Sequence, residues 1–85
     1  MRHATPDTLK SIENLLDELR TIDGLREKKA GVFYRKSRAF LHFHEDVKGI
    51  FADVRLTEPN FDRLPVNTVT ERRALISAIR ALTAG

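Results

Sequence analysis

The chain of 85 residues contains no cysteine, only four glycines and three prolines, and no long hydrophobic run. Without cysteine, neither a disulfide scaffold nor a thiolate zinc site can form. No run of about 18 apolar residues exists, so we expect no membrane-spanning helix, and no apolar signal-peptide core follows the first residues. The glycines are scattered, so no glycine-rich phosphate loop is expected. These absences predict a soluble cytoplasmic protein.

Charge is abundant and unevenly placed. Charged residues make up 32% of the chain, and the net charge is +3. Residues 26–38 hold six basic side chains and one acidic one. A basic patch of this kind can attract nucleic acid or another polyanion, although charge also protects the edge of a sheet. The length predicts a single α+β domain over residues 1–85.

Residues 31–56 alternate in a way that predicts three antiparallel strands joined by two turns. Alternation divides their side chains between two faces. The first face is apolar: Val32, Tyr34, Ala39, Leu41, Phe43, Ile50, Ala52 and Val54. The second face carries polar and aromatic groups: Phe33, Phe40, His42, His44, Phe51, Asp53 and Arg55.

Two turns set the predicted register of this meander. A turn at residues 46–49 pairs His42 with Asp53, because a one-residue slip would place apolar residues opposite charged ones. A turn at residues 36–37 pairs Phe33 with Phe40. Lys-Ser is a poor two-residue turn compared with Asn-Gly, so a wider loop at the same register is an alternative.

Helical patterns flank the meander. Thr5 and Pro6 predict a helix start, an apolar stripe runs to residue 22, and Gly24 is expected to cap the helix end. Thr68 and Glu71 form a capping-box pattern before a second helix that ends near residue 82. We expect the connector at residues 25–30 and the proline-containing segment 57–66 to be loops, with a short edge strand near residues 64–66.

The predicted fold class is therefore α+β: a three-stranded antiparallel β-meander flanked by N- and C-terminal amphipathic helices, in the order α-β-β-β-α. If both helices cover the apolar face, the second face is open. The favoured function is then a small ligand-binding or protein-interaction domain. The predicted site is His42, His44, Asp53 and Arg55, with Phe40 and Phe51 as walls.

Each polar group has an expected role in that site. His42 and His44 would bind an anion or a metal, Asp53 would orient His42, and Arg55 would neutralise an acidic ligand. Two imidazoles and a carboxylate also suit zinc or another divalent metal, so His42, His44 and Asp53 are the candidate ligands. A His-x-His strand also occurs without metal. No cofactor is required by this interpretation.

Three further functions are alternatives. A metal-dependent enzyme could use the same cluster, but no nucleophile is evident, because cysteine is absent and Ser37 lies at the far turn. Single-stranded nucleic acid could stack on an aromatic and basic face, for which the candidates are Phe33, Arg35, Lys36, Arg38 and Phe40. An apolar-aromatic face could also bind a protein partner or pair with a second copy as a homodimer.

The run SRAFLHFHEDVKGIFADVR at residues 37–55 resembles small uncharacterised bacterial proteins with a His-x-His on a strand, an acidic turn and a second strand ending in Asp. It is also similar to the luciferase-domain family in its arginine-then-His-x-His pattern. The matching residues are Arg38, His42, His44, Asp46 and Asp53. The turn at residues 46–49 looks longer than in that family. The resemblance implies a strand-borne histidine hairpin and no particular activity.

Overall fold

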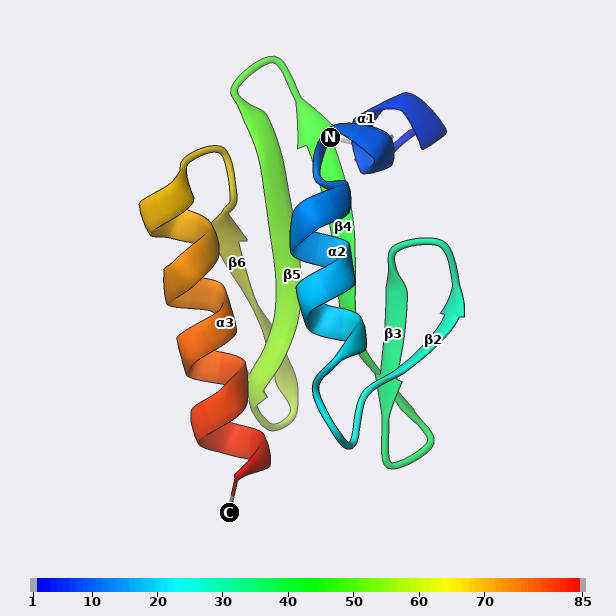
Figure 1. Ribbon diagram of the computed structural model, residues 1–85, viewed down its shortest axis with the longest axis vertical. Coiled ribbons are helices and arrows are strands. Elements are labelled where there is room, and N and C mark those ends of the chain that lie inside the picture. Colours follow the sequence, from blue (N-terminus) through cyan, green and yellow to red (C-terminus); the bar gives the residue numbers. More distant parts are fainter. Residues whose placement is uncertain (1, 85) are drawn as a thin grey trace.

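The structure is an α+β fold whose sheet has more strands than the three-stranded meander predicted from the sequence (Figure 1). The computed structural model describes residues 2–84. The elements along the chain are β1 (Arg2–His3), α1 (Pro6–Ser11), α2 (Glu13–Arg20), β2 (Arg26–Lys29), β3 (Val32–Arg35), β4 (Arg38–Asp46), β5 (Gly49–Thr57), β6 (Asn60–Pro65) and α3 (Val69–Thr83). The strands form one antiparallel sheet in the order β2-β3-β4-β5-β6, and β1 pairs with the later part of β4.

The additional strands lie where the sequence shows no clear alternation. β2 consists of four charged residues at one edge of the sheet, so its sequence has no apolar alternation from which a strand could be predicted. The charge of these residues protects the edge from pairing with another chain. β6 forms the other edge, and its Pro65 is the last residue of the strand, where a missing amide is tolerated. The expected loop at residues 25–30 is therefore largely strand, and the short edge strand expected near residues 64–66 is longer than predicted and begins at Asn60.

The pairing of β4 with β5 is the predicted one. His42 lies opposite Asp53 and His44 lies opposite Phe51. The alternating polar and apolar residues of both strands fixed this register, because a slip by one position would have exchanged the two faces. The hairpin therefore presents both histidines and Asp53 on one side of the sheet.

The predicted pairing of β3 with β4 is correct next to the turn and wrong beyond Tyr34, because the pair contains a bulge. Tyr34 lies opposite Ala39 as expected, but Phe33 lies opposite Leu41 instead of Phe40. The irregularity places Phe33 on the apolar side with Leu41, where its side chain is only 1% exposed. Phe40 is also part of the core, with 3% exposure. Neither ring belongs to the open face.

The N-terminal helical segment is interrupted at Ile12, a fully buried residue with non-helical backbone angles. Thr5 caps α1 as predicted, since its side chain accepts a hydrogen bond from the Thr8 amide. The second part, α2, ends with Thr21 at its C-cap, so Gly24 is not the cap residue. The predicted capping box of α3 is present: Thr68 accepts from the Glu71 amide, and Glu71 accepts from the Thr68 amide.

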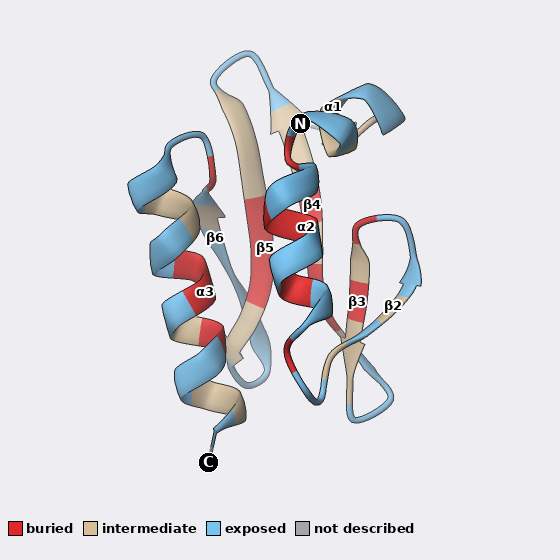
Figure 2. Ribbon diagram, viewed as in Figure 1, coloured by how far each residue is buried: buried red, intermediate tan, exposed pale blue. Residues whose placement is uncertain are grey.

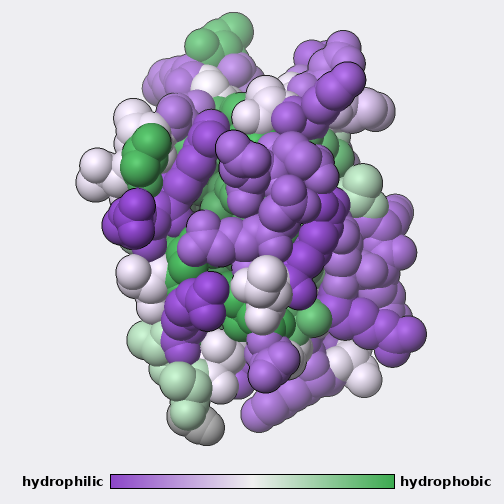
Figure 3. Space-filling model, viewed as in Figure 1, coloured by the Kyte–Doolittle hydropathy of each residue, from purple (hydrophilic) through white to green (hydrophobic). Residues whose placement is uncertain are grey.

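Both long helices, α2 and α3, lie against the same side of the sheet (Figures 1 and 2). The core lies between them and the apolar face of β3, β4 and β5, and includes Leu16, Leu19, Leu41, Val54, Leu75 and Ile79. The outer surface on the helix side is largely hydrophilic, with hydrophobic atoms visible between α2 and α3 (Figure 3). The opposite side of the sheet, which carries the histidines, is covered by no helix of residues 2–84.

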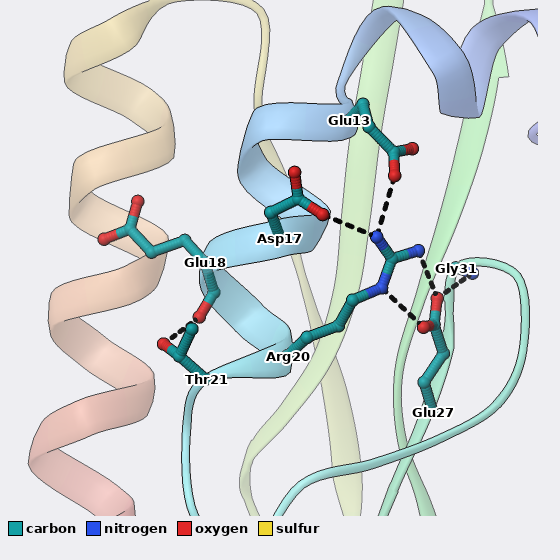
Figure 4. Close-up of polar contacts among 7 residues, drawn as sticks. All are labelled: Glu13, Asp17, Glu18, Arg20, Thr21, Glu27 and Gly31. Atoms are coloured by element: carbon teal, nitrogen blue, oxygen red, sulfur yellow. Dashed lines mark hydrogen bonds and ion pairs between the residues drawn. The ribbon is translucent and has the colours of Figure 1, made fainter.

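A group of ion pairs, here called the Arg20 network, ties α2 to the β2–β3 hairpin (Figure 4). The Arg20 guanidinium donates to Glu13 and Asp17 on its own helix and, through two nitrogens, to Glu27 on β2. Glu27 also accepts from the amide of Gly31 at 3.0 Å. Gly31 has a φ of +75°, and a Cβ there would meet the Leu9 side chain at 2.7 Å, so glycine suits both the turn and the packing.

Candidate metal centre

Three histidines converge on the helix-free side of the sheet, and these are all the histidines of the chain. His42 and His44 project from β4 on the same side because they are two residues apart. β1 adds the third, since His3 lies directly opposite His44 in the β1–β4 pair. We refer to His3, His42 and His44 as the histidine cluster.

The geometry of the histidine cluster is tight. One ring nitrogen from each residue lies within 4.8 Å of the other two. His44 Nε2 and His42 Nδ1 are 2.8 Å apart, and the rings of His3 and His44 stack with centroids 4.8 Å apart. At 2.8 Å, one of the two nitrogens must carry a proton toward the other, or a cation must lie between their lone pairs. The arrangement can therefore bind either a proton or a metal ion.

Asp53 lies beside the histidine cluster and is held by Arg63 of β6. Its two carboxylate oxygens accept from Arg63 Nε at 2.7 Å and from Arg63 Nη2 at 2.9 Å. Asp53 Oδ2 is also 3.1 Å from His44 Nε2. The Arg63 guanidinium lowers the pKa of Asp53 below its usual 3.8, so the carboxylate is charged at neutral pH although it is only 7% exposed.

The expected roles of Asp53 change accordingly. It was expected to orient His42, its cross-strand neighbour, but its side chain contacts His44 instead. As a metal ligand it is less suitable than the sequence suggested, because both oxygens already accept from Arg63. Asp53 contacts the same His44 nitrogen, Nε2, that faces His42 Nδ1, so it supplies negative charge beside the cluster but does not hold the opposite ring nitrogen of His44.

The electrostatic surroundings keep one imidazole of the cluster neutral. Burial lowers the pKa of His42 below its usual 6.5, and the neighbouring His44 lowers it further, whereas Asp53 acts in the opposite direction. Metal ions bind the neutral imidazole, so a lowered pKa reduces competition from protons at neutral pH. This effect adds to the geometry of the three rings.

The aromatic and basic neighbours differ from those predicted. Phe61 of β6, which is not among the predicted site residues, lies edge-on to His42 with ring centroids 5.1 Å apart and is 37% exposed. The Arg55 guanidinium stacks on Phe61 at 4.3 Å and donates to the carbonyl oxygens of Ala39 and Pro59. Arg55 is thus largely engaged within the protein. Phe51 lies half-buried beside His44, but Phe40 forms no wall of the site because it belongs to the core.

The five residues expected to bind nucleic acid are not arranged as a stacking platform. Phe33 and Phe40 are buried in the core, so their ring faces are not accessible to bases. Arg35, Lys36 and Arg38 lie at the β3–β4 turn, at the opposite end of β4 from His44. The structure therefore separates the predicted residues into a histidine cluster and a basic turn.

Comparison of the chain with protein-family models, with curated proteins and with solved structures found no match. No family model thus supports the resemblance of residues 37–55 to the luciferase-domain family. No helix of residues 2–84 is long and apolar enough to cross a membrane.

His3 is the residue that sequence reasoning missed. The first residues carry no apolar pattern, and chain ends without such a pattern are usually loose. The pairing of β1 with β4 depends on backbone hydrogen bonds and on the Arg2–Glu45 ion pair, which are contacts between distant residues. The one available signal was the small number of histidines, three in the whole chain.

Proposed function

We propose that this domain binds a divalent transition-metal ion through His3, His42 and His44. The observation that carries the proposal is the convergence of three ring nitrogens, none more than 4.8 Å from another, on a side of the sheet that no described helix covers. A tetrahedral zinc with bonds of about 2.0–2.1 Å holds its nitrogen ligands about 3.3 Å apart. Zinc binding therefore requires the imidazoles to rotate until ring nitrogens now up to 4.8 Å apart reach that spacing.

The donor set indicates the class of metal. Three imidazole nitrogens suit zinc, nickel, copper or cobalt, whereas calcium and magnesium prefer oxygen ligands. The charged Asp53 beside the cluster favours a cation there. Three protein ligands leave one tetrahedral position for water or for a small ligand. The proposal therefore gives the expected ligand-binding domain a specific chemical basis, and a metal-dependent enzyme would require the same centre.

A zinc titration tests the proposal. We expect metal-free protein to bind one equivalent of Zn²⁺ by calorimetry, with NMR shifts of all three imidazoles, and an excess of Mg²⁺ not to compete. His3→Gln should weaken zinc binding by at least about tenfold, and the double variant His42→Gln/His44→Gln should abolish it. Phe51→Leu is the control, because it alters the same face beside His44 and leaves every imidazole in place.

Three results would overturn the proposal. The first is an absence of zinc binding at millimolar concentration. The second is binding that shifts carboxylate-bearing residues elsewhere and leaves the imidazoles unchanged. The third is a His3→Gln variant that binds zinc as tightly as the unaltered protein, since the metal would then not be held by three histidines.

A further inference from the structure

The β3–β4 turn departs from the usual rules of hairpin stability in two ways. Lys36 and Ser37 form its two central positions with φ values of +53° and +67°, a conformation that favours glycine and asparagine. Arg35 and Arg38 lie directly opposite each other, and like charges in that position repel. Unfavourable local features that persist together often mark a place where a ligand is bound.

A cavity of about 230 Å³ lies at this turn. Arg35, Lys36 and Arg38 form its basic rim, and Phe40, Leu56 and Leu82 supply its apolar lining. We call this the turn cavity. Its volume is below the roughly 300–1,000 Å³ of pockets for drug-sized molecules, so its occupant is small. A basic rim beside an apolar lining suits an occupant that is anionic at one end and apolar at the other.

We propose that the turn cavity binds a small organic phosphate monoester, with the phosphate at the basic rim and the apolar group against the half-buried Leu56 and Leu82. A phosphate monoester carries nearly two negative charges at neutral pH and offers three acceptor oxygens. Arginine side chains match such oxygens with two parallel hydrogen bonds. A dianion between Arg35 and Arg38 would also remove the repulsion between them.

The contacts of Glu58 show that the basic groups of the turn cavity can hold an anionic group. Its carboxylate lines the turn cavity and lies 3.0 Å from Arg38 Nη1 and 3.6 Å from Arg55 Nη1. The Glu58 carboxylate thus already accepts a hydrogen bond from Arg38 and forms an ion pair with Arg55, and it would compete with a bound phosphate. Removing that charge should strengthen phosphate binding, whereas removing a rim cation should weaken it.

The site is separate from the histidine cluster. The turn precedes β4 and Arg38 is the first residue of that strand, while His42 lies in its middle and His44 nearer its other end. None of the three histidines lines the turn cavity. The phosphate proposal can therefore succeed or fail independently of the metal proposal.

Phenyl phosphate is a suitable probe, with inorganic phosphate and phenol as its two halves. We expect phenyl phosphate to shift the amides of residues 35–38 and the methyl groups of Leu56 and Leu82 in NMR spectra. Inorganic phosphate and phenol should each bind at least severalfold more weakly than phenyl phosphate. Glu58→Gln should increase the affinity for phenyl phosphate severalfold, an effect that a purely structural role of Glu58 would not produce.

Two double variants distinguish specific binding at the turn cavity from non-specific attraction of an anion to a basic protein. Arg35→Gln/Lys36→Gln should lower the affinity for phenyl phosphate about tenfold or more, the effect of losing charge-assisted hydrogen bonds. Arg26→Gln/Lys29→Gln removes the same two charges from exposed positions of β2 and should change it little. Circular dichroism checks that all variants fold.

Other results would overturn the proposal. It fails if millimolar phenyl phosphate leaves residues 35–38 unshifted, or if both double variants lose affinity equally. It also fails if a single-stranded oligonucleotide binds at the turn while phenyl phosphate does not, because the basic residues would then serve a nucleic acid.

Discussion

Asp53 is the one buried charged side chain among residues 2–84, and it determines the charge beside the histidine cluster. A buried carboxylate is stable only when it is paired and hydrogen-bonded. Arg63 provides two hydrogen bonds from the edge strand, and His44 lies within 3.1 Å. The negative charge of Asp53 is therefore fixed beside the imidazoles, where it favours a cation.

At this scale we predict that Asp53→Asn lowers the free energy of unfolding by about 1–3 kcal/mol, the usual effect of losing hydrogen bonds to a charged group. Urea denaturation at pH 7 measures the change. Asp62→Asn is the matched control, since Asp62 is an exposed acid on the neighbouring strand, and its effect should stay within about 0.5 kcal/mol. Equal effects of the two substitutions would show that the pairing of Asp53 does not stabilise the fold.

Single residues also show where sequence reasoning reached its limit. Alternation placed His42, His44 and Asp53 on one face correctly, because both strands have clear polar and apolar sides. Alternation placed Phe33 on the wrong face, because a bulge in the β3–β4 pair shifts the pattern and no residue type in the sequence indicates that bulge. It placed Phe40 on the open face although the ring is buried.

At the scale of the element, the β3–β4 turn is held in an uncommon conformation by residues that do not favour it. A residue other than glycine, asparagine or aspartate at positive φ is strained by roughly 1–3 kcal/mol. Lys36 and Ser37 are both in this region. The rest of the hairpin, with Phe33 and Leu41 in the core, keeps the turn closed.

The double substitution Lys36→Asn/Ser37→Gly should therefore stabilise the protein by about 1 kcal/mol or more, because Asn-Gly adopts this turn readily. The midpoint of urea unfolding is the measurement. Lys48→Gly in the β4–β5 turn is a control for added flexibility and should not stabilise. If the Asn-Gly variant is less stable than the unaltered protein, the turn is not strained.

The elements that could be predicted are those with an apolar side. The two hairpin strands β4 and β5 and the helices α2 and α3 each bury one face, so their sequences show a period. β1 and β2 have no buried residue, and β6 has none either, so their sequences carry little signal. Such strands form because an existing sheet edge offers unpaired backbone groups.

At the scale of the whole molecule, the two sides of the sheet differ in composition and in burial. The helices and the apolar side provide the core, while the other side presents the histidine cluster and Asp53. The β2–β3 hairpin at one edge of the sheet is also connected to the helical layer. The Arg20 network makes that connection, because Arg20 lies on α2 and Glu27 lies on β2.

The Arg20 network predicts a pH dependence of stability. Hydrogen bonds from Arg20 lower the pKa of Glu27 below its usual 4.5, and the Gly31 amide contributes in the same direction. When the folded-state pKa is the lower one, the unfolded chain binds the proton first as the pH falls. The stabilisation by ionised Glu27 is thus complete well above pH 4.5, and it is lost as the pH falls below 4.5 through the folded-state pKa.

We therefore predict that Glu27→Gln lowers the free energy of unfolding at pH 7 by up to about 1 kcal/mol, the range of partly exposed ion pairs, and that this difference shrinks toward pH 3. Urea denaturation of both proteins at pH 7, 4.5 and 3 measures it, and other titrating groups largely cancel in the comparison. Glu18→Gln removes a charge from α2 without altering the Arg20 network and controls for net charge. A Glu27→Gln difference that stays constant with pH would mean that Arg20 holds the hairpin without stabilising the charged form of Glu27.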